Sequence, residues 1–191
     1  MKFGVVGTGT MGAGIAQILA QNEHDVVMMA RRETSIERGL ATINKNLSRN
    51  VQKERMTQEE MDTVVARVKG TTNIEDLRDV DFIIEAAAED MEAKKTLFGK
   101  LDEMLGEDVI FATNTSSLSI TEIASATNRP GKVIGMHFFN PVPMMKLVEV
   151  ISGVATDEET EKRVTDLAVE LGKTPVHVEE APGFVVNRVL I

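Results

Sequence analysis

Residues 3–12 read Phe3-Gly4-Val5-Val6-Gly7-Thr8-Gly9-Thr10-Met11-Gly12, a short apolar run followed at once by glycines in the spacing G-x-G-x-x-G. Apolar residues then recur at helical spacing as far as Leu19. In a strand–turn–helix of this kind the first glycine makes the turn, the second lets backbone approach a pyrophosphate, and the third lets helix and strand pack closely. A plain glycine-rich turn is the alternative. We expect a phosphate-binding loop at the helix N-terminus, with these cofactor contacts: Gly7, Gly9, Thr10, Met11 and Gly12.

The rest of the chain alternates apolar strands with amphipathic helices. Further strands are expected at 26–30, 80–85, 109–113, 133–137, 147–151 and 175–178, and helices at 34–51, 58–68, 92–105 and 158–171. Near-continuous apolar strands that alternate with helices are typical of a parallel sheet covered on both faces. The predicted fold class is therefore α/β, a doubly wound, mainly parallel Rossmann-type sheet with helices on both faces.

Composition excludes several classes of protein. The chain has 191 residues, 42% of them apolar and 27% charged, as in a soluble globular protein. It has no cysteine, which rules out thiol catalysis, thiolate metal sites and disulfides. A net charge of -9 repels nucleic acid and anionic membranes. No apolar run approaches the about 18 residues of a membrane span. We expect a cytoplasmic protein with neither nucleic acid nor membrane as partner, and no metal.

The second strand lacks the acidic residue that usually accepts hydrogen bonds from the ribose 2′-OH of NAD. It ends instead in Ala30-Arg31-Arg32. A carboxylate would repel a 2′-phosphate, whereas arginine binds it through charge-assisted hydrogen bonds. Ala30, Arg31 and Arg32 therefore predict a preference for NADP(H), with NAD(H) as the second cofactor. Two solvated surface arginines are the alternative.

A histidine and a glutamate lie in two apolar strands, His137 at the end of one and Glu149 within the next. A carboxylate in so apolar a strand must be paired or protonated. If it bonded one imidazole nitrogen, it would fix the tautomer and leave the other nitrogen as a general acid or base. Spacing alone does not decide this pairing, and a histidine satisfied within the core is the alternative.

Three longer motifs resemble the L-3-hydroxyacyl-CoA dehydrogenases. They are Asn114–Ser119, His137–Glu149 and Ala181–Arg188, and the likeness runs from Lys2 to Ile191 and is strongest to the bacterial 3-hydroxybutyryl-CoA dehydrogenases. The resemblance implies hydride transfer between the cofactor and carbon 3 of a short-chain 3-hydroxyacyl-CoA or 3-oxoacyl-CoA, such as 3-hydroxybutyryl-CoA and acetoacetyl-CoA.

The same resemblance implies roles for individual residues. It makes His137 the catalytic acid/base, Glu149 its partner, and Ser116 and Asn187 contacts near the reacting carbon. Further positions near the cofactor fall on Glu89, Lys94, Ser116 and Asn140, and a CoA-contacting lysine falls on Lys53. A neighbouring CoA-contacting serine of the family is Asn46 here, and His24 and His177 match no functional position, so we expect both histidines to be structural or at the surface.

The chain departs from the family in two respects. Ala30 replaces the usual acid, and the helical C-terminal domain, which closes the site and forms the homodimer, is missing. We therefore expect a dinucleotide-binding domain over 1–181 and the start of a truncated helical domain over 182–191. Such a chain should bind dinucleotide but turn over acyl-CoA poorly. The alternatives are a non-catalytic nucleotide-binding or structural protein on the same fold, and a dehydrogenase of free 3-hydroxy acids.

Overall fold

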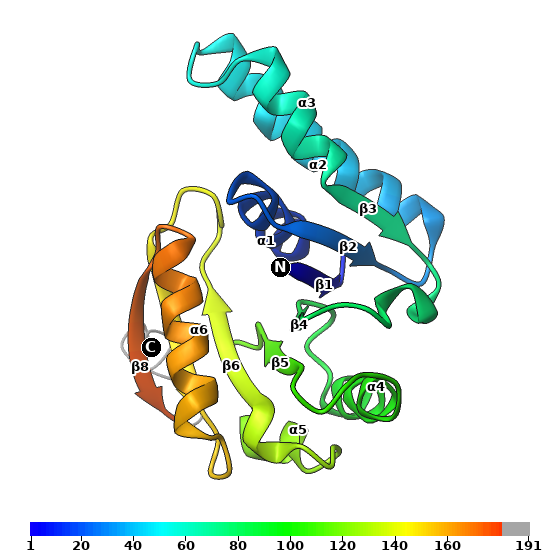
Figure 1. Ribbon diagram of the computed structural model, residues 1–191, viewed down its shortest axis with the longest axis vertical. Coiled ribbons are helices and arrows are strands. Elements are labelled where there is room, and N and C mark those ends of the chain that lie inside the picture. The colour runs from blue at the N-terminus through cyan, green and yellow to red at the C-terminus, as the bar shows by residue number, and fades with distance from the viewer. Residues whose placement is uncertain (181–191) are drawn as a thin grey trace.

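The structure is a computed structural model that describes residues 1–180 (Figure 1). One eight-stranded sheet organises these residues, in the order β3-β2-β1-β4-β5-β6-β7-β8. Its strands are β1 (Lys2–Val6), β2 (Asp25–Met29), β3 (Val68–Thr71), β4 (Phe82–Glu85), β5 (Ile110–Thr113), β6 (Val133–Phe138), β7 (Leu147–Ser152) and β8 (Thr174–Glu179). Neighbouring strands are parallel except β6 and β7, which are antiparallel. The predicted doubly wound, mainly parallel sheet is confirmed.

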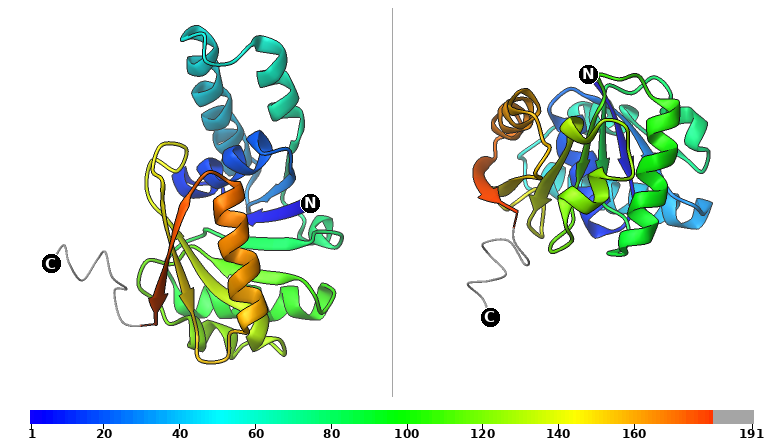
Figure 2. Two further views of the ribbon diagram at one scale, coloured as in Figure 1. Left: turned by 60° about the vertical axis from the view of Figure 1, so that its left-hand side comes forward. Right: turned by 90° about the horizontal axis from the view of Figure 1, so that it is seen from below.

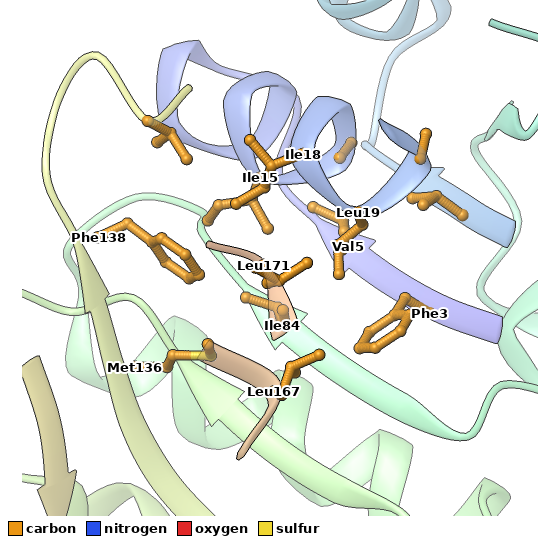
Figure 3. Packing of buried hydrophobic residues seen from close by; sticks show 14 of the residues in the cluster. Phe3, Val5, Ile15, Ile18, Leu19, Ile84, Met136, Phe138, Leu167 and Leu171 are labelled. Carbon is orange, nitrogen blue, oxygen red and sulfur yellow. The ribbon is translucent and has the colours of Figure 1, made fainter. Parts of the chain in front are cut away.

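Helices cover both faces of this sheet. They are α1 (Thr10–Gln21), α2 (Glu33–Gln52), α3 (Gln58–Ala66), α4 (Met91–Met104), α5 (Ile120–Ala124) and α6 (Glu158–Glu170), with short 3-10 helices η1 (Ile74–Leu77) and η2 (Pro130–Lys132). Within β4, Phe82 and Ile84 pack into the core with α1 and α6, whereas Ile83 packs into the core with α4 and α5. Figure 3 shows the first of these cores, where Ile15 and Leu19 of α1 lie over the sheet.

Two elements depart from the expected boundaries. The helix expected over 58–68 ends at Ala66, and Val68 begins the edge strand β3. This strand was missed because it has only four residues, of which Lys69 and Gly70 are exposed, so it carries no apolar pattern. Helix α5 was not expected either, because its five residues are too few to show a helical period. The Ser119 hydroxyl caps it by accepting a hydrogen bond from the Glu122 N–H.

The strand order sets where a ligand can bind. From β1 the chain runs outward to β2 and β3, and then crosses to β4 on the other side of β1. The connections after β1 and β4 therefore leave in opposite directions, which opens a crevice at the carboxyl ends of these two strands. Helices α2 and α3 form a hairpin that extends beyond the sheet (Figure 2). None of the helices in residues 1–180 has the length and apolar content needed to cross a membrane.

Candidate functional site

The glycine-rich loop lies at the crevice between β1 and β4, and its glycines meet different surroundings. Gly7 has φ +108°, and a Cβ there would lie 2.4 Å from the carbonyl oxygen of Ala86. A Cβ on Gly12 would lie 1.9 Å from the carbonyl oxygen of Gly7. A Cβ on Gly9 would have nothing within 4 Å, although Gly9 sits at the start of α1. The fold thus requires Gly7 and Gly12, whereas Gly9 faces open space at the start of α1.

These surroundings predict different outcomes for two alanine substitutions. Gly9→Ala should leave the free energy of unfolding within about 0.5 kcal/mol of wild type, because its φ of -69° suits alanine. It should weaken dinucleotide binding by about tenfold or more, since the methyl group occupies the open space against the phosphates. Gly12→Ala should instead cost about 1–3 kcal/mol of stability through overpacking. Urea unfolding and calorimetric titration with NADPH measure both effects, and equal stability losses in the two variants would contradict this assignment.

A cleft of about 750 Å³ opens above this loop. Its walls are the ends of β1 and β2, the segment after β4 and one face of α2. The lining includes three arginines and no aspartate or glutamate. The residues are Val6, Gly7, Thr8, Gly9, Thr10, Met29, Ala30, Arg31, Arg32, Ser35, Arg38, Thr42, Ala86, Ala87 and Ala88. Of the expected contacts, Gly7, Gly9 and Thr10 of the loop therefore line one cavity with the Ala30-Arg31-Arg32 segment, and this cavity suits an anionic ligand. Met11 and Gly12 do not line it.

Arg38 is a cleft residue that the sequence analysis missed. It lies on α2 with Ser35 and Thr42, which are three residues before it and four after it and therefore share one helical face. That face reaches the cleft because Gly39 lets α2 pack on the loop, where a Cβ would lie 3.0 Å from the Thr8 carbonyl oxygen. The Thr8 hydroxyl also donates to the carbonyl oxygen of Ser35 at 2.9 Å. The polar spacing of residues 35, 38 and 42 was the signal available in the sequence.

A buried ion pair lies at the carboxyl ends of β4 and β5. The Lys94 ammonium donates to both carboxylate oxygens of Glu85, at 2.7 and 2.8 Å, and both side chains are buried. Glu85 also accepts from the Thr113 hydroxyl at 2.7 Å and from the Ala87 N–H at 2.6 Å. With all these partners the charge on Lys94 is held in place beside the crevice. Glu85 was not predicted, although an acid that ends the apolar run Phe82–Ile84 is itself a signal.

Glu89 connects this ion pair to Ser116. Its carboxylate accepts from the Ser116 N–H at 2.8 Å and from the Ser116 hydroxyl at 3.3 Å, and it also accepts from the Thr115 hydroxyl. Lys94 lies 3.6 Å away. Burial alone would raise the pKa of Glu89, but these hydrogen bonds and the nearby ammonium outweigh it and hold the pKa below its usual value. The expected residues Glu89, Lys94 and Ser116 are thus brought together, with Glu89 as a carboxylate.

His137 and Glu149 face each other across the antiparallel pair β6 and β7. They are register partners, so their side chains stand on the same face of the sheet. The Nδ1 atom of His137 lies 2.7 Å from a carboxylate oxygen of Glu149, and the two residues are only 8% and 1% exposed. The contact expected between them is present. It has the geometry in which a carboxylate fixes one imidazole tautomer and stabilises imidazolium.

The remaining expected positions are spread along the chain. Asn140 is exposed in the loop that follows β6. Lys53 is the C-cap of α2, in the connection between the two helices of the α2–α3 hairpin, which extends beyond the sheet (Figure 2). The Asn46 amide donates to Gln17 of α1 at 3.0 Å. Asn187 lies outside the described residues. The structure therefore does not bring Lys53 to the His137–Glu149 pair.

Both remaining histidines occupy structural positions, as expected. His24 is buried, its ring lies 5.0 Å from that of Phe3, and burial lowers its pKa. The Nδ1 atom of His177 lies 3.0 Å from a carboxylate oxygen of Glu161 in a half-exposed ion pair. Neither histidine lines the cleft.

Comparisons with known proteins agree with this geometry. Residues 2–181 match the family model described as "3-hydroxyacyl-CoA dehydrogenase, NAD binding domain". A 3-hydroxybutyryl-CoA dehydrogenase of Clostridioides difficile is 56% identical over all 191 residues, which cover 68% of that protein. One from Bradyrhizobium diazoefficiens is 43% identical over 190 residues, 100% of this chain and 65% of that protein.

A solved structure gives the same result in three dimensions. The crystal structure of (S)-3-hydroxybutyryl-CoA dehydrogenase PaaH1 from Ralstonia eutropha superposes with a TM-score of 0.96 at 46% identity, over 99% of this chain and 67% of that one. The similarity covers the glycine-rich loop, the cleft and the strands that carry the histidine–glutamate pair. The chain therefore belongs to the 3-hydroxyacyl-CoA dehydrogenase family, and its described residues form the family's NAD-binding Rossmann domain.

Proposed function

We propose that the protein with this chain transfers a hydride between NADP(H) and carbon 3 of a short-chain 3-hydroxyacyl-CoA or 3-oxoacyl-CoA, with 3-hydroxybutyryl-CoA and acetoacetyl-CoA as the pair. The observation that carries this proposal is the His137–Glu149 contact of 2.7 Å. It joins an ionisable pair to the same carboxyl edge of the sheet that holds the glycine-rich loop. This position supports general acid–base chemistry on a substrate bound at the same edge as the dinucleotide.

The residues divide the reduction of a 3-oxo group among them. When bound, a nicotinamide cofactor would supply the hydride. His137 gives a proton from Nε2 to the developing alkoxide, and Glu149, bonded to Nδ1, stabilises the imidazolium before that transfer. Ser116 and Asn187 orient the substrate oxygen. In the opposite direction His137 accepts the hydroxyl proton.

Charge at the cleft supports NADP(H) as the preferred cofactor. Arg31, Arg32 and Arg38 line the cleft, and no carboxylate does. Ala30, at the end of β2, cannot accept a hydrogen bond from a ribose 2′-OH through its side chain. A 2′-phosphate therefore has charged donors available, whereas a 2′-OH lacks its usual acceptor. NAD(H) remains the second cofactor of this proposal.

The other contacts and the wider setting follow the family resemblance. The resemblance implies that Glu89, Lys94, Ser116 and Asn140 contact the cofactor and that Lys53 contacts the CoA moiety. Because these four cofactor positions belong to the β4–β6 side of the crevice, across β1 from the arginines after β2, we assign them to the nicotinamide half. The division into a dinucleotide-binding domain over 1–181 and a helical domain that starts at 182 is part of the same proposal. So are a homodimer of the full-length protein, a cytoplasmic location, and the absence of nucleic acid and membrane among its partners.

Rates with matched substrates test the proposed reaction. The purified full-length protein should oxidise NADPH with acetoacetyl-CoA and show at least about tenfold lower kcat/KM with free acetoacetate, because binding energy from the remote CoA contributes to catalysis. Equal rates with acetoacetate would instead support a dehydrogenase of free 3-hydroxy acids. Tight NADPH binding without turnover of either substrate by the full-length protein would support the non-catalytic alternative.

A further inference from the structure

Lys173 is a buried charged residue that the proposed mechanism does not use. It is 8% exposed, and its Nζ donates to the carbonyl oxygens of Val142 and Met145 at 2.5 and 2.8 Å. Within residues 1–180 it forms no ion pair with a carboxylate, and burial lowers its pKa. A charge buried against neutral carbonyls alone carries a desolvation cost. We therefore consider what Lys173 does for the segment that contains Val142 and Met145.

The backbone at the end of α6 fixes the position of Lys173. Gly172 has φ +71°, and its N–H donates to the Val169 carbonyl at 2.9 Å. The Lys173 N–H donates to the Ala168 carbonyl, also at 2.9 Å, which completes a Schellman turn. The next residue begins β8, where the Thr174 N–H bonds to the Lys146 carbonyl at 2.7 Å. Lys173 is thus fixed between a helix end and a paired strand.

The segment held by Lys173 comprises residues 140–146, which follow Phe139 in the loop that connects β6 to β7. All of its residues are exposed except Val142, which is 2% exposed. Val142 lies over α1, where a Cβ on Gly14 would come within 2.8 Å of the Val142 Cβ. Figure 1 shows this loop beside α1, above the end of β6. Besides the Thr174–Lys146 hydrogen bond at its end, the loop is therefore anchored by the Val142 contact and by the Lys173 ammonium.

This anchoring bears on Asn140, the second residue of the loop. Asn140 follows His137 at the end of β6 and precedes Val142, whose carbonyl Lys173 binds. We propose that Lys173 is a positioning residue that holds Asn140 against the nicotinamide half of the cofactor. The inference rests on the proposed function, which assigns Asn140 to that half. The adenosine half binds at Arg31, Arg32 and Arg38, on elements that Lys173 does not contact.

Affinities for the whole cofactor and for its adenosine half distinguish this positioning role from a general loss of stability. Lys173→Met keeps the side chain's length but leaves both carbonyls without a donor. It should weaken NADPH binding roughly five- to tenfold, the factor that one lost hydrogen bond at Asn140 is worth. Binding of adenosine 2′,5′-bisphosphate, the adenosine half alone, should stay within about twofold. Lys173→Arg, which keeps charge and donors, should recover most of the NADPH affinity.

A double-mutant cycle tests whether the effect passes through Asn140. In an Asn140→Ala background, Lys173→Met should add less than about twofold to the loss of NADPH affinity. Lys162→Met, an exposed lysine on α6, is the control and should change neither affinity. Should Lys173→Met fail to fold, Lys173→Gln, which keeps an N–H donor, takes its place in the same measurements.

Three outcomes would overturn this role. The first is that Lys173→Met weakens binding of NADPH and of the bisphosphate by equal factors. The second is that Lys173→Met weakens NADPH binding as much in the Asn140→Ala background as in wild type. The third is that a folded Lys173→Met variant binds NADPH as tightly as wild type. If the wild type binds NADH more tightly than NADPH, then NADH and AMP replace the two probes, and only the NADP preference fails. A full-length wild type that binds neither dinucleotide refutes the proposed function, and with it this inference.

Discussion

Replacement of His137 by Ala in the full-length protein is expected to lower turnover of acetoacetyl-CoA by about 10²–10⁴-fold, the usual contribution of a general acid–base group. The His137 imidazole lies against the buried Glu149 carboxylate at the end of β6 and is the proposed proton donor. Its removal leaves the alkoxide without a proton donor while the dinucleotide site stays intact. Steady-state rates with NADPH measure the loss, and NADPH affinity should change by less than about twofold.

Glu149→Gln is expected to lower the same rate by a similar order, although Glu149 need not touch substrate. A neutral amide can neither stabilise imidazolium nor enforce the tautomer that presents Nε2 as the acid. Because the two residues act as one unit, the double variant His137→Ala/Glu149→Gln should be no slower than about the His137→Ala variant alone. Additive losses, or an unchanged rate and pH profile in Glu149→Gln, would show that the 2.7 Å contact is only structural.

The chain contains a matched control for this pair. His177 and Glu161 also form a histidine–carboxylate contact, at 3.0 Å, but it is half exposed and lies on β8 and α6, outside the cleft. His177→Ala and Glu161→Gln should leave turnover within about twofold of wild type, since exposed pairs contribute little. A comparable loss in these variants would mean that the effect at His137 reflects stability and not catalysis.

The elements of the fold that could be predicted from the sequence are those whose burial produces a regular pattern of apolar residues. Strands β1, β4 and β6 are buried on both faces and therefore read as apolar runs, and α6 carries its apolar residues on one face. Strand β3 pairs with β2 alone, and only one of its four residues is buried. Its sequence therefore shows no apolar periodicity. Its presence is dictated by the neighbouring strand, which is a tertiary effect that local sequence does not record.

The site was predictable to the extent that it lies in contiguous motifs. The glycine-rich loop and Ala30-Arg31-Arg32 are each one segment, and both line the cleft. The His137–Glu149 contact depends on the antiparallel register of β6 and β7, which spacing along the chain did not decide. Arg38, Glu85 and Lys173 were missed because each acts through packing: a helix face, a strand end and a helix terminus. Their contacts come from residues that are distant in the sequence, so the sequence alone does not reveal them.

Cofactor discrimination is expected to be the other large effect, with NADP(H) bound roughly ten- to a thousandfold more tightly than NAD(H). A hydrogen bond to a charged group contributes about 1.5–3 kcal/mol, and one or two arginine contacts to a 2′-phosphate give this range. Arg31, Arg32 and Arg38 are exposed, which favours the low end because solvent and salt screen their charge. Calorimetry with NADPH and NADH at moderate salt measures the ratio directly.

Substitutions at the cleft should shift this ratio in a defined direction. Arg31→Ala/Arg32→Ala should weaken NADPH by about tenfold or more and leave NADH within about twofold, since only the phosphorylated ribose loses a partner. Ala30→Asp added to that variant should raise NADH affinity, because the carboxylate accepts from the 2′-OH and repels a phosphate. Arg163→Ala, an exposed arginine on α6 outside the cleft, is the matched control and should change neither affinity. If wild type binds NADH as tightly as NADPH at moderate salt, the arginines at the end of β2 are merely solvated, and the absence of a carboxylate from the cleft does not select the cofactor.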